Sequence, residues 1–141
     1  HCTVGSAVLN GVPPQKIRKI IGIAKAYRTY VGAKPFETES EYFELIRKEG
    51  GEFGATTGRP RQINWIDLDD VIKAANINGV TDLVINKLDV LEKVGVFRYI
   101  YKGEEFESEN FQDFVDFIDG VITKNCHSIV DIVWSRSPHE I

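Results

Sequence analysis

Methionine is absent from the 141-residue sequence, and cysteine occurs only twice, as Cys2 and Cys126. Without methionine the chain does not contain its own initiator, and no charged and apolar signal segment stands at its start. We therefore expect residues 1–141 to be a piece of a longer protein. The two cysteines match no metal-ligand spacing, and we interpret them as reduced thiols of a cytoplasmic protein.

The sequence also lacks a basic excess and long apolar runs. Seventeen Lys and Arg against 21 Asp and Glu give a net charge of −4 and a pI near 5.4. This balance argues against nucleic acid as a partner, which would need a basic face. No apolar run approaches the about 20 residues of a membrane helix, so we expect no membrane partner either. The remaining composition, 43% hydrophobic and 27% charged, is that of one globular domain.

The apolar pattern predicts helices that alternate with strands. Helices are expected over residues 15–20, over the segment that runs from a capping box at residues 38 and 41 to residue 49, over residues 67–79, and after a cap at residue 108. Strands are expected over residues 21–31, 82–86, 96–101 and 128–133. Residues 1–12 and 52–64 are predicted to be loops, and 102–104 a turn. This alternation predicts an α/β fold in layers, with a largely parallel sheet and flanking helices.

One loop concentrates groups that bind anions. Residues 54–61 (GATTGRPR) combine two glycines, two threonines and two arginines. Arginine forks match carboxylates and phosphates, and glycines beside threonine N–H and O–H groups form an anion-binding concavity. Pro60 restricts Arg59 to an extended backbone, so the guanidiniums of Arg59 and Arg61 are expected to point apart. Leucine at either arginine should cost under about 0.5 kcal/mol of stability, as at an ordinary surface position. A solvated basic turn is the alternative.

Two further polar segments follow predicted strands. Residues 86–89 (NKLD) follow one strand, and residues 135–138 (SRSP) follow the last. Asp89 can accept hydrogen bonds from the N1–H and the amine of guanine, while the Lys87 stem can lie along a purine face. Ligands of open α/β sheets bind beyond the carboxyl ends of strands, where both segments are expected. Each segment alone is also compatible with a surface turn.

Catalytic groups are not apparent in this sequence. It contains no GxxxxGK[ST] loop and no GxGxxG after a strand. His1, His127 and His139 are scattered, and Cys2 has no suggestive His or Asp partner, so none is predicted to be a general base or a nucleophile. We predict no catalytic residue and no metal ligand among residues 1–141.

Taken in order, these motifs resemble the C-terminal part of the adenylosuccinate synthetase family. The resemblance covers residues 1 to about 91, resumes over 131–141, and rests chiefly on residues 25–32 (KAYRTYVG), 52–61 (EFGATTGRPR), 65–68 (WIDL) and 87–91 (KLDVL). It implies that residues 1–141 are the C-terminal portion of a larger, P-loop-like nucleotide-binding enzyme fold. The N-terminal portion, which supplies the phosphate loop, the catalytic residues and the Mg²⁺ site in this family, is expected to be absent.

The resemblance also implies a function. Members of this family use GTP to join IMP and L-aspartate into adenylosuccinate, with GDP and phosphate as the other products, in purine nucleotide biosynthesis. The implied partners are IMP, L-aspartate, GTP, a second copy in a homodimer and the N-terminal portion of the protein. The implied location is the cytoplasm. The 141-residue chain alone is expected to be inactive.

The resemblance carries two sets of site residues. The set implied for L-aspartate and IMP comprises Ala55, Thr56, Thr57, Gly58, Arg59, Pro60 and Arg61, with Val31 and Gly32 lining the pocket for the IMP sugar. The set implied for GTP comprises Arg61, near its phosphates, and Lys87, Leu88, Asp89, Ser135, Arg136 and Ser137, around its guanine base.

Departures from the family pattern leave alternatives open. The usual Thr-Arg-Val-Gly is here residues 29–32 (TYVG), the usual Arg-Arg is residues 61–62 (RQ), and Ser-Thr-Gly is residues 135–137 (SRS). The segment between 96 and 129 is short, as in the compact archaeal and phage branches. Because the phage branch joins aspartate to a guanylate, (d)GMP is the alternative purine substrate. A non-catalytic purine-nucleotide-binding domain is the alternative of another class.

Overall fold

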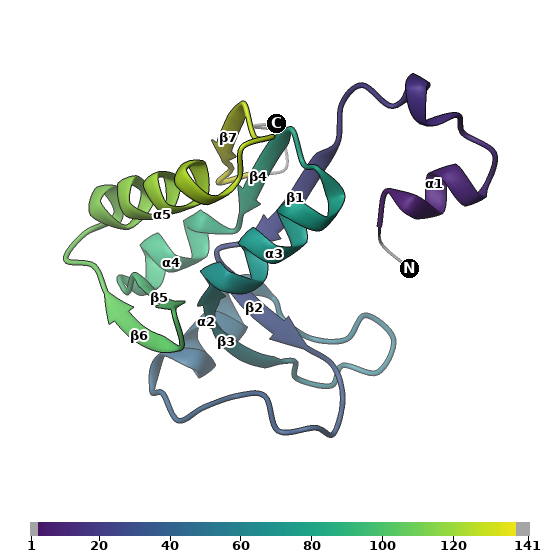
Figure 1. Cartoon of the computed structure of the whole chain (residues 1–141). Helices are drawn as coiled ribbons and strands as arrows, with labels where there is room; N and C mark the ends of the chain where they lie inside the picture. Colours follow the sequence, from purple (N-terminus) through teal and green to yellow (C-terminus); the bar gives the residue numbers. More distant parts are fainter. Residues whose placement is uncertain (1–2, 138–141) are drawn as a thin grey trace.

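Two β-sheets and the helices around them make up the fold in the computed structural model, which describes residues 3–137 (Figure 1). The elements in chain order are α1 (Gly5–Leu9), the 3₁₀ turn η1 (Pro14–Lys16), β1 (Ile21–Lys25), β2 (Tyr27–Tyr30), α2 (Tyr42–Gly50), β3 (Gln62–Asp67), α3 (Leu68–Asn78), β4 (Asp82–Asn86), α4 (Leu88–Val94), β5 (Arg98–Tyr101), β6 (Glu104–Glu107), α5 (Phe111–Asn125) and β7 (Asp131–Trp134). None of the helices within residues 3–137 is long and apolar enough to cross a bilayer.

The first sheet is parallel throughout and confirms the predicted α/β class. Its strands lie in the order β1-β4-β7, with Ile21 opposite Asp82 and Asp82 opposite Asp131. The side chains of Leu83 and Ile85 in the central strand are buried, as a strand covered by its neighbours requires. All three strands therefore end at one edge of the sheet, where the predicted ligand segments begin.

The second sheet is mixed and was not predicted. Its order is β2-β3-β5-β6, in which β2 and β6 are antiparallel to their neighbours and β3 is parallel to β5. The single strand expected over residues 21–31 is therefore wrong, because the chain passes at Ala26 from β1 in one sheet to β2 in the other. Ala26 is fully buried, and its N–H donates to the Asn86 carbonyl at 2.8 Å. The alternation of apolar residues continues through this corner, so the sequence pattern does not reveal the passage from one sheet to the other.

Several local predictions also need correction. The helix expected over residues 15–20 is only the turn η1, and the expected N-terminal loop contains α1. The loop expected over 52–64 ends where β3 begins, at Gln62. Strand β6 and helix α4 were missed; all four residues of β6 are exposed, so β6 lacks the alternating apolar pattern that marks a half-buried strand.

Caps explain where the longer helices begin and end. Asp67 caps α3 by accepting hydrogen bonds from the N–H groups of Asp69 and Asp70, and Gly79 ends that helix with a φ of 61°, as predicted. Helix α5 is capped by Asn110 rather than by Ser108. The capping box predicted for α2 is absent, because α2 has no side-chain cap hydrogen bond at its start.

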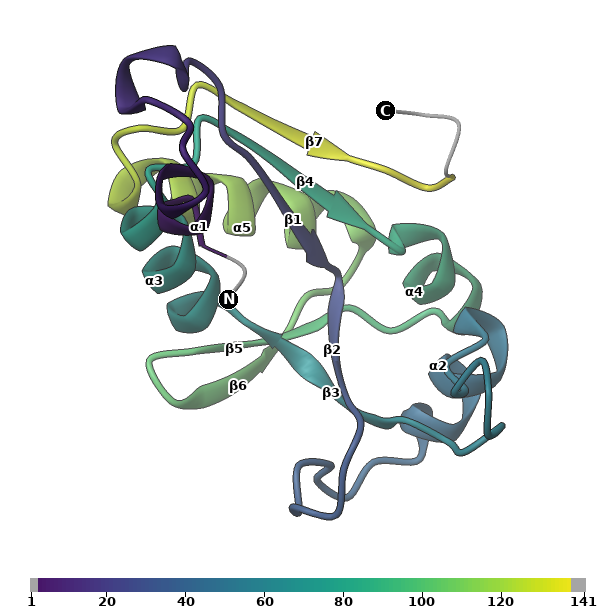
Figure 2. The same ribbon diagram turned by 90° about the vertical axis from the view of Figure 1, so that its right-hand side faces the viewer.

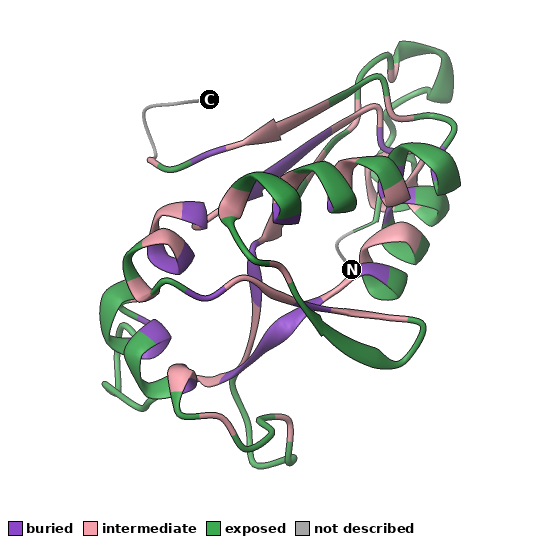
Figure 3. Cartoon of the chain, turned by 90° about the vertical axis from the view of Figure 1, so that its left-hand side faces the viewer, coloured by how far each residue is buried: buried purple, intermediate pink, exposed green. Residues whose placement is uncertain are grey.

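Helices α3 and α5 pack along one face of the parallel sheet (Figure 2). Their buried residues, Leu68 and Ala75 from α3 and Phe114, Ile118 and Ile122 from α5, belong to the main hydrophobic core. Figure 3 shows the outward sides of the helices exposed and their buried residues turned inward. This packing fixes the sheet, and so fixes the edge at which the polar segments emerge.

The left-handed end of α3 gives a first prediction. Gly79→Ala should lower the free energy of unfolding by about 1–2 kcal/mol, because an L side chain is disfavoured at a φ of 61°. A Cβ at Gly79 would meet nothing within 4 Å, so backbone strain is the only cost. Gly120→Ala in the body of α5 is the matched control, since its Cβ also meets nothing and its φ is not positive. The free energy of unfolding of the control, measured in urea, should rise by about 0.5–1 kcal/mol. Equal effects of the two substitutions would contradict the prediction.

Candidate functional site

The carboxyl edge of the parallel sheet gathers two of the predicted segments. The N–H of Ser135 donates to the Ile85 carbonyl at 2.9 Å, directly after β7 and beside the end of β4. The Asn86 carbonyl, in turn, accepts from the main chain that leaves β1. The structure thus brings residues 86–89 and 135–137 to one edge.

The first of these segments turns sharply into a helix. Lys87 has a φ of 67°, and its Nζ donates to the Gly50 carbonyl at 3.0 Å, at the C-terminal end of α2. Leu88 is buried in the core. Asp89 lies half-buried in the first turn of α4. Of the three predicted guanine-binding residues, Asp89 therefore presents a carboxylate at the edge, while Leu88 anchors the turn.

The second segment is held by its own contacts. Ser135 is buried, and its hydroxyl donates to the Ser137 carbonyl at 2.8 Å. The Arg136 guanidinium donates to both carboxylate oxygens of Glu92, at 2.9 and 3.2 Å, and lies 5.0 Å from the ring centre of Phe111. These contacts fix residues 135–137 against α4 and α5. Pro138, which followed in the sequence motif, lies outside the described residues.

The predicted anion loop is closed at its base. Phe53 and Pro60 form an isolated antiparallel bridge, and the Gly54 N–H donates to the Arg59 carbonyl at 2.8 Å. The Gly58 N–H donates to the Gly54 carbonyl, also at 2.8 Å. Residues 55–60 are all exposed. The loop therefore offers its hydroxyl and main-chain groups to solvent from a tied base.

The two arginines of this loop occupy different environments. Arg59 is exposed, whereas Nη1 of Arg61 donates to Oε2 of Glu52 at 2.8 Å. The Glu52 carboxylate is only 2% exposed. Nε of Arg61 is buried and has no hydrogen-bond partner among the described residues. The expectation that both arginines are ordinary surface residues is therefore wrong for Arg61, because it compensates a buried charge.

Glu52 organises a cluster that the sequence analysis missed. Its Oε1 accepts from Lys25 Nζ and from the Tyr27 hydroxyl, each at 2.8 Å, and Lys25 Nζ also lies 3.3 Å from Thr29 Oγ1. Both Glu52 and Arg61 stand in the motif at residues 52–61, yet nothing in their spacing shows that the glutamate points inward. Lys25 and Tyr27 alternate along the predicted strand, which is the one signal that places them on a common side.

The cluster has unusual protonation properties. Burial alone would raise the pKa of Glu52, but hydrogen bonds from Lys25, Tyr27 and Arg61, together with the Lys25 charge, hold that pKa below its usual range. Burial and the neighbouring Glu52 carboxylate raise the pKa of Tyr27 far above the phenol range, and the charge of Asp89 adds to this effect. The cluster therefore keeps an ionised carboxylate and a protonated phenol.

Val31 and Gly32 lie beside the end of the anion loop. The side-chain amide of Gln62, next to Arg61, donates to the Gly32 and Lys34 carbonyls at 2.9 Å and accepts from the N–H groups of residues 36 and 37. Val31 is 69% exposed. The structure thus places the residues predicted for the IMP sugar next to those predicted for L-aspartate.

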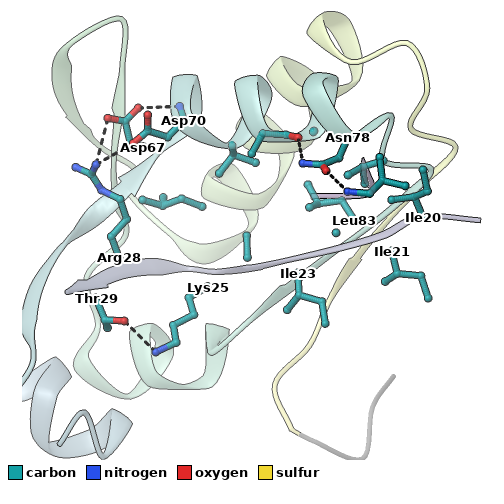
Figure 4. Close-up of a pocket in the computed structure, with 18 of the residues that line it drawn as sticks. Ile20, Ile21, Ile23, Lys25, Arg28, Thr29, Asp67, Asp70, Asn78 and Leu83 are labelled. Atoms are coloured by element: carbon teal, nitrogen blue, oxygen red, sulfur yellow. Dashed lines mark hydrogen bonds and ion pairs between the residues drawn. The ribbon is translucent and has the colours of Figure 1, made fainter. Parts of the chain in front are cut away.

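A cavity of about 1000 Å³ runs along β1 and α3 (Figure 4). Its lining is mainly apolar, and none of the predicted site residues contributes to it. Figure 4 shows Lys25 and Thr29 on one side of the β1–β2 ribbon and Arg28, with its carboxylate partners Asp67 and Asp70, on the other. The Lys25 ammonium, which belongs to the Glu52 cluster, therefore points away from α3.

Within residues 3–137, no three His, Cys, Asp or Glu side chains gather in a way that could hold a metal ion. His127 is exposed, and burial raises the pKa of the Cys126 thiol. Cys2, His1 and His139 lie outside the described residues.

Comparison with known proteins points to one family. The family model described as adenylosuccinate synthetase matches residues 1–122. An adenylosuccinate synthetase from Trichlorobacter lovleyi is 44% identical over 113 residues, covering 76% of this chain and 26% of the relative. One from Kocuria rhizophila is 55% identical over 89 residues, covering 62% of this chain and 21% of the relative. The chain spans about a quarter of the length of these curated relatives.

A solved structure supports the same fold. The structure of fully ligated adenylosuccinate synthetase from Plasmodium falciparum matches 94% of this chain and 41% of its own chain, with a TM-score of 0.75 and 23% sequence identity. At that identity the likeness is one of fold.

The contrast between the two loop arginines gives a second prediction. Arg61→Leu should lower the free energy of unfolding by about 1–2 kcal/mol, because it removes a charged partner of a buried carboxylate, while the guanidinium is one-third exposed and partly screened. Arg59→Leu, on the same loop, should change the free energy of unfolding by less than about 0.5 kcal/mol. Urea unfolding at pH 7 compares them.

The same pair responds to pH. Because the folded-state pKa of Glu52 is lowered, its ionisation stabilises the fold above the ordinary glutamate pKa of 4.5, and this stability is lost as the pH falls through the lower folded value. The difference in the free energy of unfolding between Arg61→Leu and wild type should therefore shrink below about pH 4. A difference that stays constant from pH 7 to pH 3 would show that the Glu52 charge is not what Arg61 compensates.

Proposed function

The chain belongs to the adenylosuccinate synthetase family, and we propose that it carries the aspartate loop and the guanine-binding part of a GTP-dependent ligase. In this proposal the complete enzyme joins IMP and L-aspartate into adenylosuccinate for purine nucleotide biosynthesis. The observation that carries the proposal is the convergence of residues 86–89 and 135–137 at one sheet edge, with the closed loop nearby.

Guanine is proposed to bind at the carboxyl edge of the parallel sheet. Asp89 would accept hydrogen bonds from the N1–H and the amine of the base. Lys87 is held by the Gly50 carbonyl, so its stem is fixed where a purine face could lie along it. Leu88 and Ser135 are buried and support the two turns from below, and residues 136 and 137 complete the edge.

L-Aspartate is proposed to bind in the loop. Exposed Arg59 would pair with a carboxylate, and Thr56 and Thr57, with the adjacent N–H groups, would supply further donors. Arg61 stands at the inner end of the loop, where we propose that it faces the GTP phosphates. Val31 and Gly32 would border the IMP sugar. Ala55, Gly58 and Pro60 shape the loop rather than donate to a ligand.

The chemistry divides between this chain and the rest of the enzyme. In the proposed reaction GTP phosphorylates the 6-oxygen of IMP, and the amine of aspartate then displaces that phosphate, which leaves as inorganic phosphate. The residues of this chain bind and orient the substrates. We propose that Mg²⁺ and the catalytic residues belong to an N-terminal portion, as the resemblance to the family implies.

The assembly is part of the proposal. The relatives are about four times as long as the region they share with this chain, so the N-terminal portion of the enzyme is the first proposed partner. A homodimer in the cytoplasm is the proposed working form. A guanylate substrate and a non-catalytic domain are not favoured by the family match.

Complementation tests the function as a whole. The chain is mixed with the part of the Trichlorobacter lovleyi enzyme that it does not match, and GDP and adenylosuccinate are measured with GTP, IMP and L-aspartate. Turnover should require both polypeptides. Turnover with dGMP in place of IMP would move the chain to the guanylate-using branch, and no turnover beside clear GTP binding would favour a binding domain.

Guanine recognition gives a third prediction. In the complemented enzyme, Asp89→Asn should reduce the preference for GTP over ITP by about tenfold. The Asp89 carboxylate accepts a hydrogen bond from the exocyclic amine of guanine, which the base of ITP lacks, so the substitution should weaken the binding of GTP more than that of ITP. Asp131→Asn, at the opposite end of the sheet, is the matched control and should keep the wild-type preference. The ratio of kcat/KM for the two nucleotides is the measurement, and an unchanged ratio in Asp89→Asn would remove Asp89 from the guanine site.

Aspartate binding gives a fourth prediction. Arg59→Leu should raise the KM for L-aspartate about ten- to a hundredfold in the complemented enzyme, because one charge-assisted partner of the dicarboxylate is lost. The melting temperature should not change, since Arg59 is exposed. Arg18→Leu, another exposed arginine, serves as the control for loss of a positive charge. Equal KM values in the two variants would show that Arg59 does not hold the substrate.

A further inference from the structure

Two cations share one buried carboxylate in the Glu52 cluster. Lys25 Nζ binds Oε1 and Arg61 Nη1 binds Oε2, each at 2.8 Å. The Glu52 side chain is 2% exposed, whereas Lys25 and Arg61 are 29% and 31% exposed. Glu52 therefore binds two cations at once, and both cations lie on the solvent side of the carboxylate.

Both cations retain hydrogen-bond donors for a ligand. Nε of Arg61 is buried and has no partner among the described residues, which is costly for a charged donor. The ammonium of Lys25 has three N–H donors, and its described contacts are with Glu52 and Thr29. An oxyanion seated between Lys25 and Arg61 would accept hydrogen bonds from the ammonium and from the exposed part of the guanidinium.

The position of the cluster is that of a substrate site. Lys25 is the last residue of β1, in register with Asn86 at the carboxyl edge. Arg61 closes the anion loop. Lys87 Nζ donates to the carbonyl of Gly50, two residues before Glu52, so the cluster also lies near the proposed guanine site. The cluster thus stands between the loop and the sheet edge.

Main-chain contacts hold Glu52 in place. Its N–H donates to the Arg47 carbonyl at 2.9 Å, and its own carbonyl accepts from the Arg61 N–H at 3.0 Å. Gly50 leaves room for the phenol, because a Cβ there would overlap the Tyr27 hydroxyl. The carboxylate is therefore fixed before any ligand arrives, as preorganised binding requires.

We propose that Lys25 and Arg61 form a two-cation seat for a phosphate oxyanion, and that Glu52 is the positioning residue that holds both. The part played by Arg61 rests on the proposed function, whereas Lys25 and Glu52 go beyond it. Glu52 acts through the two cations and does not touch the anion itself.

Calorimetric titration of the 141-residue chain with tripolyphosphate at low salt tests the seat. Lys25→Gln and Arg61→Gln should each weaken binding about tenfold, as expected for the loss of one charge-assisted partner. Lys25→Arg should bind tripolyphosphate within a few-fold of the wild-type affinity, because it keeps the positive charge. Lys73→Gln, on the exposed side of α3, controls for net charge and should bind as wild type does. No binding by wild type, or equal losses in Lys73→Gln and Lys25→Gln, would overturn the seat.

Glu52→Gln separates positioning from simple charge balance. If Glu52 only opposes the anion, its neutralisation should strengthen tripolyphosphate binding. If Glu52 positions the cations, binding should weaken about tenfold although the chain gains positive charge. Circular dichroism checks that the variant is folded. Should it unfold, Tyr27→Phe decides, because it loosens the carboxylate without changing charge and should weaken binding a few-fold; unchanged or tighter binding overturns the positioning role.

Nucleotide competition keeps this proposal distinct from the proposed function. Displacement of tripolyphosphate by GTP or by IMP identifies which nucleotide presents its phosphate, and displacement by neither overturns the seat as part of a substrate site. Binding of GTP no tighter than UTP, with the Lys25 effect intact, would refute the guanine site and leave the seat. Preference for GTP without a Lys25 effect would refute the seat and leave the guanine site.

Discussion

The buried carboxylate of Glu52 is the constraint on which the arrangement of the site depends. An ionised group that is almost fully buried must be compensated by hydrogen bonds and opposite charge, since an uncompensated one costs several kcal/mol. Its compensation comes from the end of β1, the start of β2 and the residue before β3. The corner between the two sheets and the base of the anion loop are therefore fixed by one side chain.

A short segment joins the two proposed substrate sites. The Gly50 carbonyl, at the C-terminal end of α2, accepts a hydrogen bond from the Lys87 ammonium, and the helix dipole favours a cation at that end. Two residues later, Glu52 holds Arg61. The turn proposed to bind guanine and the anion loop consequently rest on the same three residues, 50–52, so the geometry of one proposed site is tied to that of the other.

Sequence periodicity predicted the parts of the fold that depend on local signals. The bounds of β4 follow from its apolar run, and those of α3 follow from the Asp67 cap and the Gly79 end. The passage at Ala26 from one sheet to the other depends on tertiary packing, and alternation is the same on both sides of it. Glu52 illustrates the same limit in the site, because a glutamate in a glycine-rich segment is ordinarily exposed and only the fold supplies its three donors.

The Gln62 substitution shows how a departure from the family pattern can be structural. A guanidinium at this position could donate but never accept, whereas the amide does both. Its oxygen holds two main-chain N–H groups and its nitrogen holds two carbonyls, all within residues 32–37. The loss of a cation beside Arg61 is therefore matched by a four-bond clamp on the segment that follows β2. Because Val31 and Gly32 lead into that clamp, the position of the proposed sugar-binding backbone depends on the amide, and Arg61 is left as the cation at the inner end of the loop.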